Sequence, residues 1–260
     1  MERGVTARRS SYIAGVSSAA LYRRPAPDKD AGLRDRLRSV WRPNMGYRMA
    51  HALVRGEFAP LNVKRVHRLW KAERLGRIKR YRKKRTGNPL PQAASRPNEV
   101  WCVDFCYDWS LSGAKLKILM VVDEFTRECL ALEAATSIKS LKVQSILRAL
   151  FESRGAPKYL RSDNGSEFFA RSLAVFLVQS GTESRFIRPG SPWQNAHAES
   201  FVSRLRAELL DVEVFHNLAD AQVKLALFRR FYNEQRPHSS LGYRTPAEAM
   251  SRFKEGGDYS

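Results

Sequence analysis

The chain has 260 residues, of which 43% are hydrophobic and 28% charged, and this length suits one substantial core plus a small accessory domain. No apolar run approaches the roughly 18 residues that a membrane span needs. The N-terminal apolar residues are too scattered for a signal peptide. Cys102, Cys106 and Cys129 form no CxxC pair, which fits a reducing compartment. We therefore expect a soluble cytoplasmic protein without a membrane partner.

The formal net charge of +20 indicates a polyanionic partner, and nucleic acid is the first candidate. Residues 1–97 contain 25 of the 46 Lys and Arg residues but only 6 of the 26 Asp and Glu residues. The remainder of the chain is therefore almost neutral. Such an asymmetry indicates a domain boundary near residue 97, where the sequence RTGNPLPQAASRPNE is typical of a linker.

Five segments follow from these patterns. We expect an N-terminal segment at 1–28, a basic helical domain at 29–76, a basic linker at 77–97, a nearly neutral domain with a C-terminal helical extension at 98–253, and a tail at 254–260. Within the linker, seven of the nine residues from Arg77 to Arg85 are basic. We expect this run, including Lys83 and Lys84, to contact DNA phosphates, which would add affinity but little sequence information.

Three short helices are expected in the basic part, at residues 31–40, 47–55 and 63–74. In the third, the 3.6-residue periodicity predicts an apolar stripe, with Asn62 as the N-cap. A basic helix after such a helix pair is typical of a helix-turn-helix domain, which lays one helix in the major groove. A basic surface helix with no groove partner is an equally open interpretation. The stripe consists of Val63, Val66, Leu69 and Trp70, and the outward DNA-contacting residues are Lys64, Arg65 and Arg68.

From Glu99 onward the pattern changes to strands. Trp101, Val103 and Phe105 alternate with polar or small residues, so Asp104 should face the opposite side of its strand from these three apolar side chains. A carboxylate in the middle of such a strand is unusual. Further strands are expected at 115–123, 130–135 and 159–161, with an amphipathic helix at 141–154 as the crossover, which predicts a mixed sheet.

Two further acids are unremarkable when considered alone. Asp163 follows the fourth strand, where open α/β sheets place ligand-binding groups, although an Asp in an Asp-Asn-Gly sequence more often only shapes a turn. Glu199 lies at the edge of the apolar stripe of a helix that begins near Asn195, and an exposed glutamate is the usual case there. The combination of Asp104, Asp163 and Glu199 is more specific than any of its members.

At this point the sequence resembles the DDE transposases and retroviral integrases, most closely the OrfB product of the insertion-sequence family three. The resemblance covers about residues 20–253. Its motifs are GYRMAHALVR (46–55), LNVKRVHRLWKAERLG (61–76), WCVDF (101–105), VVDEFTRE (121–128), LRSDNGSEF (160–168), SPWQNAHAESF (191–201) and YNEQRPHSSLGYRTPAEA (232–249).

The resemblance implies an α/β fold: a ribonuclease H-like mixed five-stranded sheet flanked by helices, with an N-terminal all-α helix-turn-helix domain. It also implies that Asp104, Asp163 and Glu199 are the catalytic and metal-binding triad. Carboxylate oxygens suit Mg²⁺ or Mn²⁺, and two ions are expected. Arg206 matches a position where the family commonly has Lys or Arg, and we expect it to hold a DNA phosphate.

Other polar residues near the triad have less specific interpretations. Trp193 and Gln194, just before the helix of Glu199, are candidate DNA contacts. His197 should point away from Glu199 and lie on the surface, or at most contact DNA. Glu167 is interpreted as a charge at a helix N-terminus. Asp123 and Glu124 should shape the hairpin, with Arg127 within reach.

The expected function is a transposase that binds the ends of a mobile element and catalyses metal-dependent DNA cleavage and strand transfer. Its expected partners are terminal inverted repeats, target DNA, further copies of the chain and an OrfA-type protein or fusion, at the nucleoid. Two alternatives remain open: a nuclease of the same fold that only cuts, and a non-catalytic DNA-binding regulator.

Overall fold

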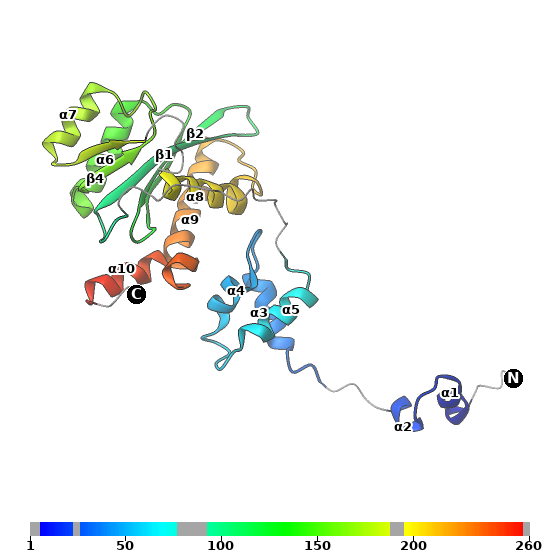
Figure 1. Ribbon diagram of the computed structural model, residues 1–260. Coiled ribbons are helices and arrows are strands. Elements are labelled where there is room, and N and C mark those ends of the chain that lie inside the picture. Colours follow the sequence, from blue (N-terminus) through cyan, green and yellow to red (C-terminus); the bar gives the residue numbers. More distant parts are fainter. Residues whose placement is uncertain (1–5, 23–26, 77–92, 188–194, 257–260) are drawn as a thin grey trace.

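The structure, a computed structural model, describes residues 6–22, 27–76, 93–187 and 195–256 (Figure 1). The basic part contains α1 (Ala7–Ile13), α2 (Ser18–Leu21), α3 (Ala31–Val40), α4 (Tyr47–Val54) and α5 (Val63–Ala72). The three helices expected from periodicity are therefore confirmed, each ending within two residues of its predicted end. The division of the chain into five segments stays a prediction.

Helices α3, α4 and α5 share one hydrophobic cluster that includes Leu37, Val54 and Trp70. The predicted cap is confirmed, because Asn62 accepts a hydrogen bond from the backbone N–H of Lys64 at 2.8 Å. One prediction is wrong: Val63 is 37% exposed, whereas Val66 is fully buried. The first turn of α5 thus extends beyond the cluster, and the apolar stripe begins one turn later.

The second part contains a five-stranded mixed sheet. Its strands are β1 (Val100–Trp109), β2 (Lys115–Asp123), β3 (Cys129–Ala135), β4 (Tyr159–Ser162) and β5 (Glu183–Phe186), in the order β3-β2-β1-β4-β5. The pairs β1/β2 and β2/β3 are antiparallel, whereas β1/β4 and β4/β5 are parallel. The predicted mixed sheet of five strands is confirmed.

Helices cover both faces of this sheet (Figure 1). They are α6 (Ser140–Arg154) and α7 (Arg171–Gln179) on one face, and α8 (Ala196–Leu205) and α9 (Leu218–Glu234) on the other. The last helix, α10 (Pro246–Lys254), packs against α9. Helix α10 begins with a capping box in which Thr245 and Glu248 satisfy each other's backbone N–H groups. No helix in the described parts of the chain combines the length and the apolar composition that a membrane crossing requires.

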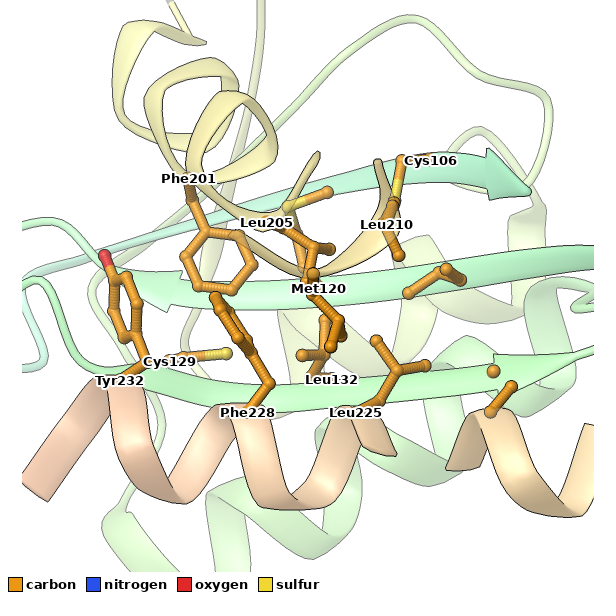
Figure 2. Packing of buried hydrophobic residues seen from close by; sticks show 14 of the residues in the cluster. Cys106, Met120, Cys129, Leu132, Phe201, Leu205, Leu210, Leu225, Phe228 and Tyr232 are labelled. Carbon is orange, nitrogen blue, oxygen red and sulfur yellow. The ribbon is translucent and has the colours of Figure 1, made fainter. Parts of the chain in front are cut away.

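Two hydrophobic clusters hold the sheet between these helices. Residues of β1 and β2 with odd numbers, such as Val103 and Leu119, pack toward α6 and α7. Residues with even numbers, such as Cys106 and Met120, pack toward α8 and α9. Figure 2 shows the second cluster, in which side chains from both α8 and α9 meet the strands. The strand alternation therefore directs Asp104 away from Trp101 and Val103, as predicted, and toward the face that α8 covers.

Helix α8 ends in a wider turn of π-helix over Arg206–Leu210. The N–H of Asp211 donates to the carbonyl of Arg206 at 2.8 Å, five residues earlier. Such π turns are rare and occur mostly at functional sites. The apolar stripe predicted for this helix is nevertheless confirmed, because Ala198, Phe201, Leu205 and Leu209 are all buried.

Candidate active site

Asp104 lies in the middle of β1, directly opposite Met120 of β2. One of its carboxylate oxygens accepts a hydrogen bond from the N–H of Phe105 at 2.8 Å. Burial raises the pKa of Asp104 to about 6, and the negative charges of Asp163 and Glu199 act in the same direction. The carboxyl group of Asp104 therefore lies in the electrostatic field of both other acids.

Asp163 is the first residue after β4, at the carboxyl end of that strand. Because β4 runs parallel to β1 with Arg161 opposite Cys102, the chain reaches Asp163 beside the segment of β1 that contains Asp104. The N–H of Gly165 donates to Asp163 Oδ1 at 3.0 Å. A side chain at residue 165 would bring its Cβ within 3.0 Å of that same oxygen, which explains the glycine.

Glu199 is half-buried in the first turn of α8. Its neighbour Ala198 packs in a small cluster with Val100 and Cys102, so this turn lies directly against β1. The buried side chain of Asn195, at the N-cap, donates from Nδ2 to the carbonyl of Val103 at 3.5 Å. These contacts of Asn195 and Ala198, both just before Glu199, fix the start of α8 against the strand of Asp104.

The structure thus brings three acids that are far apart in the sequence to one side of the sheet. Within the described residues, however, no three His, Cys, Asp or Glu side chains already converge as a metal site. The donor set itself fits a hard divalent cation, since it consists of carboxylate oxygens. A bound cation would also favour the charged form of Asp104, whose pKa is raised by burial and by the charges of the other two acids.

Arg206 is exposed at the junction between α8 and its π turn, on the same side as Glu199. Its Nη2 atom donates to the carbonyl of Tyr107 near the end of β1 at 3.2 Å. This contact places the guanidinium beside β1, and its charge acts to lower the pKa of Cys106, whose net shift is upward because of burial. Phosphate binding by Arg206 stays a prediction.

The basic residues of α5 are exposed and, with Asn62, line a shallow hollow on the surface. Two of them have an internal partner that the sequence did not indicate. Arg65 Nη2 lies 2.6 Å from one oxygen of Asp30, and Arg68 Nη2 lies 2.8 Å from the other. The hydrogen bond from Arg65 is the main cause that lowers the pKa of Asp30. Part of the positive charge of α5 is therefore already compensated within the chain.

Four of the predicted DNA contacts lie outside the described residues. They are Lys83, Lys84, Trp193 and Gln194. Their roles stay predictions.

His197 is not a surface residue, contrary to the sequence-based interpretation. Its side chain is only 16% exposed and its Nε2 atom lies 3.6 Å from Glu124 Oε1. Burial and the charge of Arg127 lower the pKa of His197 to about 3, so the ring is neutral at physiological pH. The direction of His197 relative to Glu199 does not decide its exposure, because the opposite side of the first turn of α8 packs against the β2–β3 turn.

The expected role of Glu167 is also wrong. Helix α7 begins only at Arg171 and has no acidic residue in its first turn. Glu167 instead forms an ion pair with the buried Lys117 of β2. This pair connects β2 to the loop that follows Asp163.

The acids of the β2–β3 turn have two different roles. Asp123 shapes the turn as predicted, because it accepts hydrogen bonds from the N–H groups of Thr126 at 2.7 Å and Asn98 at 2.8 Å. Glu124 does more than shape a hairpin. It is 2% exposed and forms a buried ion pair with Arg161 of β4. Glu124 and Arg161 belong to two separate sequence motifs, 121–128 and 160–168, so neither motif by itself indicates the ion pair between them.

Two Integrase core domain family models match the chain, at residues 94–192 and 180–246. The 31.7 kDa protein of insertion element IS407 from Burkholderia multivorans is 36% identical over 98% of this chain and 94% of its own length. The transposase InsD of IS2 from Escherichia coli is 30% identical over 80% of this chain and 74% of its own length.

The chain belongs to the OrfB-type integrase-core transposases of the insertion-sequence family three. The resemblance found from the motifs is thereby confirmed. The catalytic core of BIV integrase is also similar, with 20% identity over 61% of this chain and 97% of that chain, and a TM-score of 0.47.

The C-terminal part of the integrase core contains a second buried histidine, His238, and this residue yields a test of pH dependence. Burial and the charges of Arg236 and Arg204 lower the pKa of His238 to about 3. Below a pH of about 6.5 the unfolded chain binds a proton that the folded chain does not. The neutral His238 ring therefore contributes its full stabilisation to the folded state above that pH, and this contribution is lost as the pH falls toward 3.

Between about pH 7.5 and pH 5 the wild-type protein should lose unfolding free energy, because the unfolded chain binds a proton at His238. We expect this loss, measured by urea denaturation, to be about 2 kcal/mol smaller in His238→Gln. Glutamine keeps a donor for the carbonyl of Tyr232, which the His238 ring contacts at 3.4 Å. An identical pH dependence in the variant and the wild type would contradict the neutral buried histidine.

Proposed function

We propose that this chain is the catalytic transposase of an insertion element and that Asp104, Asp163 and Glu199 are its catalytic residues. The observation that carries this proposal is geometric: Asp104 lies in the middle of β1, Asp163 directly follows the parallel neighbour β4, and Glu199 is in the first turn of α8, which packs against β1. A half-buried site with three carboxylates is costly for folding by itself, because like charges repel more strongly when water is excluded. A bound cation would offset this repulsion, so such a site suits a cationic ligand.

The proposed cofactor is a pair of Mg²⁺ or Mn²⁺ ions. Asp104, on the strand that β4 pairs with and that α8 packs against, would contact both ions, whereas Asp163 and Glu199 would each complete one coordination sphere. When bound, two divalent ions in such a site clamp the attacking and leaving oxygens of an in-line phosphoryl displacement. The chain's own contribution is to hold the three carboxylates on rigid elements: a central strand, the end of a parallel strand and the first turn of a helix.

The proposed reaction has two steps at the same site. In the first, water attacks a phosphodiester at the end of the element, the P–O3′ bond breaks, and the released strand keeps a 3′-hydroxyl. In the second, that hydroxyl attacks a phosphodiester of target DNA, a new P–O bond forms, and another 3′-hydroxyl leaves. Neither step needs a covalent enzyme intermediate, so the site requires no nucleophilic side chain.

The basic N-terminal part would supply the DNA binding that precedes cleavage. Its last helix, α5, exposes Lys64 beside the N-cap Asn62, which is the end of a recognition helix that usually contacts DNA. Arg206 would hold a phosphate near the triad, and Lys83, Lys84, Trp193 and Gln194 would extend the DNA contact. We further propose assembly of several copies on terminal inverted repeats, with an OrfA-type partner or fusion, at the nucleoid.

Substitution of the triad should separate catalysis from binding. Asp104→Asn and Glu199→Gln keep the size of the side chain but remove a charge, so we expect Mg²⁺-dependent nicking and joining of DNA with inverted repeats to fall at least about a hundredfold. DNA binding, measured by fluorescence anisotropy, should be unchanged. Glu133→Gln on β3, which neutralises an exposed carboxylate of the same sheet, is the matched control.

The outcomes distinguish three functions. Nicking that persists in both triad variants would refute the assigned site. Nicking without any joining by the wild-type chain would favour a nuclease that only cuts. Specific binding without nicking in the wild type would favour a DNA-binding regulator.

A second test concerns α5. If Lys64 contacts a phosphate, Lys64→Ala should weaken binding to DNA of any sequence and reduce the slope of log affinity against log salt by about one. Lys254→Ala, on the exposed surface of α10, should leave this slope unchanged. The same salt slope in the Lys64 variant and the wild type would place the DNA interface elsewhere.

A further inference from the structure

Close to the triad in the fold, four polar side chains contact one another in the interior: Glu124, Arg127, Arg161 and His197. Glu124 is at the centre of this cluster. Its Oε2 atom accepts a hydrogen bond from Arg161 Nη1 at 2.5 Å, and its Oε1 atom accepts one from the N–H of Ala94 at 3.2 Å. Oε1 also lies 3.6 Å from His197 Nε2. The His197 ring also contacts the guanidinium of Arg127, whose Nη1 atom lies 3.0 Å from the same Nε2 atom.

The residues of this cluster lie on, or bond to, the same elements as the triad acids. Arg161 is on β4, two residues before Asp163, and His197 is on α8, two residues before Glu199. The backbone N–H of Glu124 donates to the carbonyl of Val100 at the start of β1, the strand of Asp104, at 2.9 Å. One residue therefore contacts all three elements that carry the triad acids.

Stability alone does not account for this cluster. The side chains of Glu124 and Arg161 are 2% and 3% exposed, and removing two charges so completely from water costs free energy that their attraction only partly restores. Arg161 Nη2 is also buried without a hydrogen-bond partner among the described residues. Apolar residues of similar volume would fold at least as well in general. Apolar residues would, however, lack the directional hydrogen bonds of the Glu124–Arg161 pair, which fix the relative positions of the elements that they connect.

We propose that Glu124 is a positioning residue that holds the Asp163 strand and the Glu199 helix in register with β1, so that the three carboxylates can bind metal together. This inference rests on the proposed function of the triad. Glu124 contacts neither substrate nor ion in this account. It acts through Arg161 and His197, as outer residues around metal sites orient the ligands themselves.

The same turn contains a matched control. Glu128 forms a two-point ion pair with Arg154, at 2.5 and 2.7 Å, and is itself 8% exposed. This pair connects the residue before β3 to the end of α6 and involves none of the three elements that carry the triad. Its loss should cost stability without any effect on metal binding.

The experiment measures Mn²⁺ binding to the DNA-free full-length protein by electron paramagnetic resonance, together with the Mg²⁺ dependence of nicking. The variants are Glu124→Gln, the double variant Glu124→Gln/Arg161→Met, and His197→Ala. The double variant removes both buried charges, so no unpaired guanidinium remains to unfold the protein. His197→Ala breaks only the helix side of the cluster and leaves the Glu124–Arg161 pair intact. Glu128→Gln and Glu128→Gln/Arg154→Met are the controls.

We expect the Glu124 variants to bind Mn²⁺ at least about tenfold more weakly, with a parallel rise in the Mg²⁺ concentration for half-maximal nicking. His197→Ala should change both in the same direction, while the Glu128 variants match the wild type. Wild-type Mn²⁺ binding in a folded Glu124 double variant would overturn the proposal. If that variant does not fold, wild-type binding by His197→Ala overturns it instead. A wild-type protein that neither binds Mn²⁺ nor nicks DNA would refute the proposed function itself.

Discussion

The structure depends on one electrostatic constraint: Asp104 is half-buried in the middle of β1, within the field of two further carboxylates. Burial raises the pKa of Asp104, and the negative charges of Asp163 and Glu199 act in the same direction. The fold nevertheless holds each of these acids on or beside an element that is itself fixed by a hydrophobic cluster or by buried polar contacts.

The helix of Glu199 illustrates how this is achieved. Helix α8 packs on β1 through Ala198 near its start and through Phe201 and Leu205 further along. Phe201 in turn contacts Phe228 and Tyr232 of α9, with ring centroids 6.4 and 4.9 Å away (Figure 2). The C-terminal region is thus part of the catalytic unit, because α9 completes the cluster that holds α8 against the sheet.

The parts of this account that sequence predicts are those with a local signal. Alternation in β1 indicates the face of Asp104, and periodicity gives the helices of the basic part. Interactions between distant residues have no such signal. The partners Glu124 and Arg161 are separated by 37 positions, and Arg65 and Asp30 by 35, so neither pair follows from strand or helix spacing. The same limit explains the wrong interpretations of His197 and Glu167, whose surroundings come from other strands and turns.

The most direct test of the central claim is anomalous X-ray diffraction from crystals of the protein grown with Mn²⁺. The account predicts anomalous density between Asp104, Asp163 and Glu199, with manganese within about 2.2 Å of oxygens from at least two of these acids. Crystals of the Asp104→Asn variant should lack it. Manganese bound only elsewhere, or a triad that remains apart at saturating Mn²⁺, would contradict the claim that these three acids form a metal site.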